Sequence, residues 1–447
     1  MGSRVEVVAQ NMGSVTAKMD KWEKDEQEDV MKLFKEKYGP LIQLALIFPS
    51  WKSSSRSSTI MIFVLHSVVL LFHWMLIMIS IKRSLESEWN FEMLTIWIHF
   101  AFIVFFVFIV IFCVNNQRST YFRQYQIMSN DIGHHRGADG SIYETDGCIS
   151  EAENIKREML LYMIIPVLIF LFASTVYGLP YISKWLEGME NPYTLAMVNM
   201  NLPVPAWYPF PTHAGLGHFT AMAGQALVAL SVGVVLITII LLFLTNALRI
   251  KFEFRVICYA LQTLFTRSTT LFLQMQHDMK DIGNSEHSYQ RVIGSCLVDI
   301  VVHHRAVSEL ISIFEKQVFF TCALGYMVGT IGVGLSLVNI LEAMKVGNYV
   351  SVLTFSMMAS METLLMFTIS QIGETITEES VKLRHQVYDI EWHKLDTQNR
   401  KILLIFQTAI TEPIIVKAGG VINMCLDTFS NIMNMSYSFF NLMTNTN

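Results

Sequence analysis

Long apolar segments limit what this 447-residue chain can fold into. There are six apolar segments, 58–81, 91–114, 159–180, 219–248, 318–341 and 350–372, followed by a more polar closing segment within 413–447. Each of the six holds about 20 apolar residues, enough for an α-helix to cross the roughly 30 Å hydrocarbon core of a bilayer. Inside lipid, a helix satisfies its own backbone hydrogen bonds. The sequence therefore predicts an all-α polytopic membrane protein with seven transmembrane helices.

The composition agrees with a membrane protein and excludes other classes. Hydrophobic residues make up 52% of the chain and charged residues only 15%, a balance that is typical of polytopic membrane proteins. The net charge is −5 and no basic segment is interleaved with aromatic residues, so nucleic acid is not an expected partner. Membrane lipids are expected partners.

The distribution of Lys and Arg predicts the topology. Nine of them precede the first span and only two follow it, and the same alternation continues along the chain. Because positively charged loops stay inside the cell, we expect an intracellular N-terminus and an extracellular C-terminus. The predicted parts are a cytoplasmic N-terminal region 1–57, spans one to four in 58–248 with an outer lid loop 181–218, a cytoplasmic helical extension 249–317, spans five and six in 318–372, cytoplasmic anchor helices in 373–412, and the last span in 413–447.

The last apolar region must consist of two pieces. One helix over 402–443 would be about 63 Å long at 1.5 Å per residue, twice the thickness of the bilayer core. Thr411-Glu412-Pro413 and Gly419-Gly420 supply the break, because proline ends a helix and glycine permits a turn. We therefore expect a short cytoplasmic helix at about 395–409 and a spanning helix over 420–443.

The closing segment carries a stripe of polar side chains. Their spacing of three or four residues places them on one face of a helix, and they are Asn423, Asp427, Asn431, Asn434, Ser438, Asn441 and Asn445. Polar groups in lipid cost several kcal/mol each unless they are satisfied. The stripe must therefore face protein or water, either as an adhesive surface between helices or as the wall of a conduit.

Ionisable residues inside spans are candidates for function, because their burial is costly. Glu362 in the sixth span is the clearest, with a helix-packing hydrogen bond as the alternative. Asp427 near the inner end of the last span is the second. Four copies of Asp427 around an axis would form an anionic ring that favours cations, whereas a capping or packing role is the simpler interpretation.

A ligand cavity needs apolar and aromatic walls with a few polar groups. The outer halves of spans two, three, four and six offer such residues, although aromatic and Met residues at helical spacing more often face lipid or the core. The candidates are Trp97, His99, Phe102, Ala173, Tyr177, Phe219, Met222, Phe355 and Met358.

Signatures of catalysis are missing from the sequence. No GxSxG, Walker or GxGxxG pattern occurs in a suitable context. The adjacent pairs His134-His135 and His303-His304 belong to no metal-ligand pattern, since neighbouring side chains on a helix point in different directions. We expect no enzymatic activity, no metal site and no cofactor.

Motifs in the C-terminal part resemble the closing signature of insect odorant receptors. They are, in order, Gly373-Glu374, Gln386-Val387-Tyr388, Trp392, Arg400-Lys401-Ile402, Pro413, Ala418-Gly419-Gly420, Thr428-Phe429 and Tyr437-Ser438-Phe439-Phe440. The run 202–210 (LPVPAWYPF) is similar to the second outer loop of that family. The length, the seven spans and the inside N-terminus agree, and 437–440 resembles the ligand-tuned subunits rather than the shared co-receptor.

The resemblance implies a function. Members of that family are subunits of tetrameric, odorant-gated, non-selective cation channels in the plasma membrane of sensory neurons, formed with a co-receptor or as homotetramers. A small hydrophobic volatile would bind in the outer half of the bundle, at the candidate cavity residues. The last helix would line the pore through Asp427, Asn431, Asn434, Ser438, Asn441 and Asn445, with Leu442 as the gate.

Two other functions stay open at the level of sequence. A metabotropic seven-transmembrane receptor coupled to a cytoplasmic transducer would need an outside N-terminus, which the charge distribution disfavours. A transporter would have a substrate site near the bilayer midplane and often an internal repeat, and only Glu362 favours it.

Overall fold

The structure is a computed structural model that describes residues 56–87, 91–117, 193–278 and 286–445, together with scattered positions between 120 and 183. It confirms the all-α class. The helices are α2 (Arg56–Ser87), α3 (Phe91–Asn116), α7 (Gly215–Gln262), α8 (Leu264–Asp278), α9 (Glu286–Lys345), α10 (Tyr349–Tyr388), the 3-10 turn η2 (Trp392–Lys394), α11 (Thr397–Ala409) and α12 (Leu426–Asn445). A two-stranded hairpin, β1 (Lys417–Ala418) and β2 (Ile422–Asn423), precedes α12.

Five described helices are long and apolar enough to cross a membrane: α2, α3, α7, α9 and α10. They match the predicted spans one, two, four, five and six. Most of the predicted third span lies outside the described residues. The helix α12, which corresponds to the predicted seventh span, has 20 residues and carries the polar stripe, and it is not among the five.

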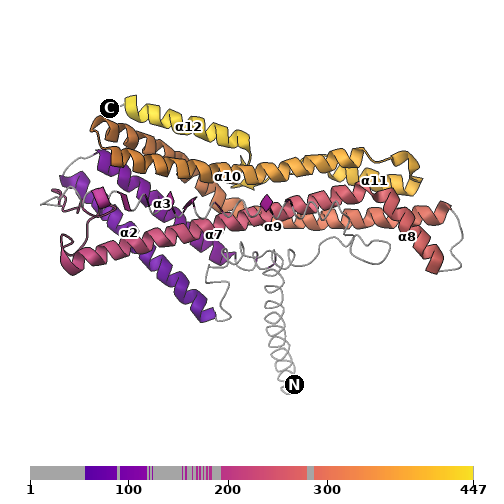
Figure 1. The fold of residues 1–447 in the computed structure, drawn as a ribbon, viewed down its shortest axis with the longest axis horizontal. Helices are drawn as coiled ribbons and strands as arrows, with labels where there is room; N and C mark the ends of the chain where they lie inside the picture. The colour runs from indigo at the N-terminus through magenta and orange to yellow at the C-terminus, as the bar shows by residue number, and fades with distance from the viewer. Residues whose placement is uncertain are drawn as a thin grey trace, which may run out of the picture.

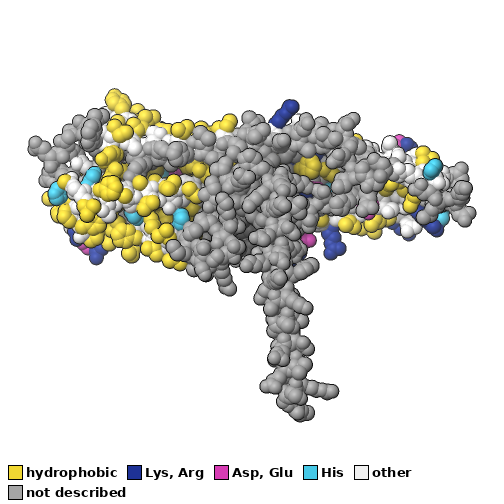
Figure 2. Space-filling model, turned by 60° about the horizontal axis from the view of Figure 1, so that its bottom comes forward, with side chains coloured by type: hydrophobic (Ala, Val, Ile, Leu, Met, Phe, Trp, Pro, Cys, Tyr) yellow, Lys and Arg dark blue, Asp and Glu magenta, His cyan; other side chains and the backbone are white. Residues whose placement is uncertain are grey.

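Three helices extend far beyond the thickness of a bilayer. The helix α7 has 48 residues, α9 has 60 and α10 has 40, which correspond to about 72, 90 and 60 Å at 1.5 Å per residue. They lie side by side along the long axis, with α2 and α3 at one end and α8 and α11 at the other (Figure 1). Hydrophobic side chains form a broad band over the α2–α3 half of the molecule (Figure 2).

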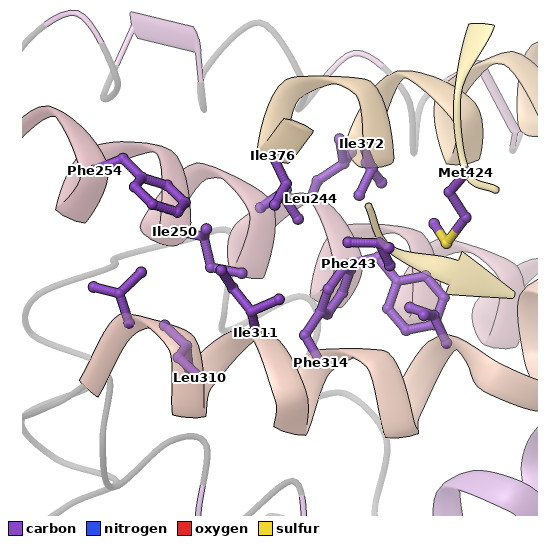
Figure 3. Close-up of a cluster of buried hydrophobic side chains, with 14 of the residues drawn as sticks. Phe243, Leu244, Ile250, Phe254, Leu310, Ile311, Phe314, Ile372, Ile376 and Met424 are labelled. Atoms are coloured by element: carbon purple, nitrogen blue, oxygen red, sulfur yellow. The ribbon is translucent and has the colours of Figure 1, made fainter. Parts of the chain in front are cut away.

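The main core is formed where α7, α9 and α10 converge. Phe254 and Phe314 are fully buried and Phe243 is 3% exposed. Phe243 contacts Phe314 edge to face, with ring centroids 5.8 Å apart. Figure 3 shows these side chains pointing toward Ile372 and Ile376 of α10. Outside lipid, each such buried aromatic or aliphatic side chain stabilises the fold by about 1.5–3 kcal/mol.

A buried carboxylate in the extension beyond the spans is paired. The buried Glu253 of α7 forms an ion pair with Arg249 and lies 2.8 Å from Nε2 of the buried His303 in α9. Such pairing is required, because an unpaired buried charge is very costly. Burial lowers the pKa of the next residue, His304, to about 4, with His303 adding to the shift. The His304 ring is therefore neutral at pH 7, and it contacts Phe406 of α11.

The C-terminal region breaks where the sequence predicts and begins again later than expected. The helix α11 ends at Ala409, in agreement with the predicted short helix. The prediction of a helix that starts at Gly420 is wrong, because 417–423 form the hairpin and α12 begins at Leu426. Gly419 and Gly420 adopt φ of +61° and +73°, a region that glycine enters without strain. Asn423 therefore lies in β2 and not on the helical stripe.

The contact between Gly373 of α10 and Met424 gives a testable prediction. A Cβ atom on Gly373 would lie 2.0 Å from the carbonyl oxygen of Met424. Gly373→Ala should therefore displace the start of α12 and lower the free energy of unfolding by about 1–3 kcal/mol, the usual effect of overpacking. Thermal unfolding of the purified protein measures this change. Gly233→Ala is the control, since nothing lies within 4 Å of its Cβ position, and equal melting temperatures for the two variants would contradict the prediction.

Candidate functional site

An apolar cavity of about 230 Å³ lies inside the bundle at the α2–α3 end. Helices α2, α3, α7, α9 and α10 contribute to its wall, together with the segment 204–208 and Phe172. The helix α7 provides a continuous stripe of lining residues at helical spacing: Gln225, Val228, Ala229, Val232, Leu236, Ile239, Ile240 and Phe243. A concave, mostly apolar space with a few polar groups has the character of a small-molecule site.

The proline-rich segment 193–214 closes the cavity on one side. It contains no helix and is held by isolated bridges from Asn199 to Tyr193 and Ala206. The Trp97 indole donates to the Pro205 carbonyl at 2.6 Å. Gln225 of α7 accepts from the Val204 N–H at 3.1 Å and donates to the Val204 carbonyl at 2.8 Å. The segment is thus fastened to α3 and α7 through its own backbone.

A buried polar network lies between α3, α9 and α10. His99 Nε2 is 2.6 Å from Glu362 Oε1, and the two side chains are 1% and 12% exposed. Ser336 lies 3.4 Å from the other nitrogen of His99. One turn away, Thr95 donates to Asn339 at 2.6 Å. Glu362 also lines the cavity, and its Oε2 is buried without a hydrogen-bond partner in the described structure.

The residues predicted to bind a ligand are distributed around the cavity in different ways. Met358 lines it directly. His99 lies behind Glu362, and Trp97 holds the lid. The other positions are less direct: Phe355 is buried away from the cavity lining, Phe102 is partly buried, Met222 packs against the small core of the lid, Phe219 is 70% exposed, and Ala173 and Tyr177 lie outside the described residues. Ligand contact by these residues stays a prediction.

Sequence reasoning missed all of the α7 stripe and His73 of α2. In α7, every residue between 226 and 244 is compatible with lipid, so hydrophobic periodicity does not distinguish the face that lines a cavity. Gln225 was the available signal, because it is the polar residue at the start of that apolar run. A polar side chain within a span is expected to face protein.

One segment of α10 faces the cavity and α12 at the same time. Met358, Met361, Glu362, Leu365, Met366 and Ile369 line the cavity. The intervening positions Ala359, Ser360, Thr363, Leu364 and Phe367 line an open groove, to which Phe429 of α12 also contributes. The rings of Phe367 and Phe429 meet edge to face with centroids 5.5 Å apart. A displacement of this segment would therefore change both the wall of the cavity and the groove next to α12.

The polar stripe of α12 points away from the rest of the chain. Asp427, Asn431, Asn434 and Ser438 are exposed, Asn441 is partly buried and Leu442 is 62% exposed, whereas the side chain of Asn445 lies outside the described residues. The opposite face packs on α9 and α10. There Ile432 is buried, and Ser436 donates to the Thr330 carbonyl at 3.1 Å. Within one chain, the side chains of Asp427, Asn431 and Asn434 are therefore open to the surroundings.

The clamp between Gln225 and Val204 gives a second prediction. Gln225→Met keeps the shape of the side chain and leaves both backbone groups of Val204 without their partner, which costs about 1–3 kcal/mol per buried group. Amide hydrogen exchange at Val204 should accelerate about tenfold or more, as measured by mass spectrometry. Leu227→Met, at a position that is 53% exposed, should leave the exchange unchanged. Equal exchange in both variants would exclude the clamp.

Comparison with known proteins adds a relationship to this geometry. Odorant receptor 33a of Drosophila melanogaster is 23% identical over 166 residues, which cover 37% of this chain and 42% of that protein. Odorant receptor 10 of Aedes albopictus is 24% identical over 190 residues, covering 40% and 49%. The matched part of the chain thus spans less than half the length of these relatives.

A solved structure shares the fold. The olfactory receptor OR5 of Machilis hrabei, in complex with eugenol, superposes with a TM-score of 0.66 at 11% identity, over 86% of this chain and 88% of that one. The sequence profile of the family described as 7tm odorant receptor matches residues 145–437, well over half of the chain. The chain therefore belongs to the insect odorant receptor family.

Proposed function

We propose that this chain is a subunit of a tetrameric, odorant-gated, non-selective cation channel in the plasma membrane of sensory neurons. A small hydrophobic volatile would bind in the cavity, and α12 would line the pore. The observation that carries the proposal is the α10 segment 358–369, which lines the cavity on one face and the groove at α12 on the other. Family membership and a relative solved with eugenol support it.

The free energy that gating requires is within reach of such a cavity. Moving an equilibrium from 1:99 to 99:1 requires about 5.5 kcal/mol of preferential binding to the open state. Burial of about 220 Å² of apolar ligand surface would supply that amount at about 25 cal/mol per Å². The ligand must therefore bury most of its surface in the open state only, which suits a wall rich in flexible Met side chains.

The exposed stripe of α12 supports the assignment of the pore. In lipid, the exposed side chains of Asp427, Asn431 and Asn434 would be unsatisfied, which is costly. Four copies around an axis, either of this chain or of this chain with a co-receptor, would turn them toward water and form an anionic ring at Asp427. The predicted seven spans with an inside N-terminus and an outside C-terminus place the stripe across the membrane.

Glu362 alone suggested a transporter, and its pairing with His99 gives this residue a role in joining α3 to α10 that does not require transport. A metabotropic receptor is the remaining alternative. The speed and nucleotide dependence of the membrane currents distinguish it from a channel.

Recordings of membrane current test the channel. Cells that express this chain alone or with a co-receptor should give rapid cation currents to a panel of volatiles without added nucleotide. Ala229→Phe, which fills the cavity, should reduce the response at least tenfold, whereas Leu230→Phe, on a side chain that is 58% exposed, should not. Slow, nucleotide-dependent responses would favour the metabotropic alternative. Absent currents with protein at the cell surface would refute the channel.

The proposed gate has its own test. Leu442→Ala shortens the apolar side chain at the predicted constriction and should raise the basal cation leak severalfold in the absence of odorant. Leu404→Ala is the matched control, because Leu404 of α11 is also 62% exposed and lies outside α12. An unchanged leak in Leu442→Ala would remove this residue from the pore.

A further inference from the structure

We infer that the cavity selects ligands that carry a hydrogen-bond donor, a hydroxyl or an amine, on an apolar skeleton, with the free carboxyl oxygen of Glu362 as the acceptor. The inference deepens the proposed function, since it takes the cavity as the odorant site. It rests on the placement of a single carboxyl group in a wall that is mostly apolar.

The carboxyl group of Glu362 is held from behind. His99 engages Oε1 at 2.6 Å. The backbone of Gly332 in α9 packs so closely that a Cβ there would lie 2.4 Å from Oε1 and 2.7 Å from Oε2. Oε2 is buried, has no hydrogen-bond partner in the described structure and belongs to a residue that lines the cavity. A ligand in the cavity is therefore the available partner for this oxygen.

The position of the shared proton does not change what Oε2 offers. If His99 donates through Nε2, Glu362 is a carboxylate and both of its oxygens accept. If instead Glu362 donates to Nε2, its proton lies on Oε1 and Oε2 is the carbonyl oxygen. His99 can then donate through Nδ1 to Ser336, 3.4 Å away. In both cases Oε2 presents lone pairs to the cavity.

A second lining residue favours the same ligand chemistry. His73 Nδ1 lies 2.9 Å from the Val69 carbonyl, which can only accept, so Nδ1 carries the proton. The neutral ring then presents Nε2 as an acceptor, and that atom has no hydrogen-bond partner in the described structure. The amide of Gln225 is already used by Val204. The Tyr208 hydroxyl, also at the cavity, can donate or accept and opposes neither ligand type.

Buried acceptors without partners penalise the wrong ligand. A site with a buried hydrogen-bonding group binds an analogue that lacks the matching group much more weakly, because the protein group loses water without replacement. We expect an alcohol or primary amine to bind about 10- to 100-fold more tightly than the methyl ether or hydrocarbon of the same skeleton, where each factor of ten corresponds to 1.4 kcal/mol. A preference for amines over alcohols would indicate the ionised carboxylate.

The experiment measures binding to the purified full chain in nanodiscs by calorimetry, with empty nanodiscs as the blank for partitioning into lipid. The probes form two matched sets. One contains 1-octanol, octylamine, heptyl methyl ether and nonane, and the other contains 4-ethylphenol, 4-ethylaniline, 4-ethylanisole and 4-ethyltoluene. Tighter binding of the donors in either set supports the inference. Equal binding of donors and ethers, or no binding of any donor, overturns it.

Glu362→Gln separates ligand recognition from a structural role. Its amide oxygen can accept from His99, so its NH₂ group replaces Oε2 at the cavity. The preference should then reverse, with donors losing about tenfold or more and ethers gaining. A purely structural role predicts equal loss for all probes together with a lower melting temperature, which would count against the inference. Met361→Leu, also at the cavity wall, should change both classes equally. If Glu362→Gln does not fold, the two wild-type probe sets decide the question.

The binding test is independent of channel function. Donor-selective binding without currents would leave this inference standing and refute the channel. Odorant-evoked currents with no preference for donors would refute the inference and leave the channel standing.

Discussion

The requirement that polar groups be paired wherever water is excluded determines much of this structure. In the extension of α7 and α9, Glu253 is buried with Arg249 and His303. Within the spans, His99 and Glu362 join α3 to α10. On α12, by contrast, the stripe residues Asp427, Asn431 and Asn434 are exposed within one chain. The proposed arrangement of several chains around water would satisfy them.

The helix α10 links the two parts of the molecule that a ligand-gated channel needs. Because an α-helix is stiff and presents neighbouring residues to different faces, adjacent positions such as Met358 and Ala359 line different spaces. Gly334 contacts Phe439 and Gly373 contacts Met424 so closely that neither glycine has room for a Cβ atom. The C-terminal segment is therefore tightly packed on α9 and α10. Packed interfaces of this kind transmit a displacement rather than absorb it. This geometry gives the proposed gating a physical route from the cavity to α12.

The candidate site was less predictable from sequence than the fold. Met358 and Glu362 were recognisable as residues of interest, the first from its place in the outer half of a span and the second from its charge. The lining stripe of α7 was not, because in an apolar helix the side chains that face lipid and those that face a cavity have the same composition. Phe219, which the aromatic pattern favoured, is 70% exposed. The prediction was misleading here because the pattern does not say which face of α7 packs on its neighbours.

Sequence by itself determined the all-α membrane class, the five apolar helices that the structure describes, the end of the short helix at Ala409 and the polar stripe of α12. These features follow from local rules: apolar length, proline and glycine, and helical periodicity. Only the tertiary structure decided that His99 meets Glu362, 263 positions away, that Glu362 lines the cavity, and that α12 starts after a hairpin. Contacts between distant segments depend on how whole helices pack, and no local pattern in the sequence encodes that.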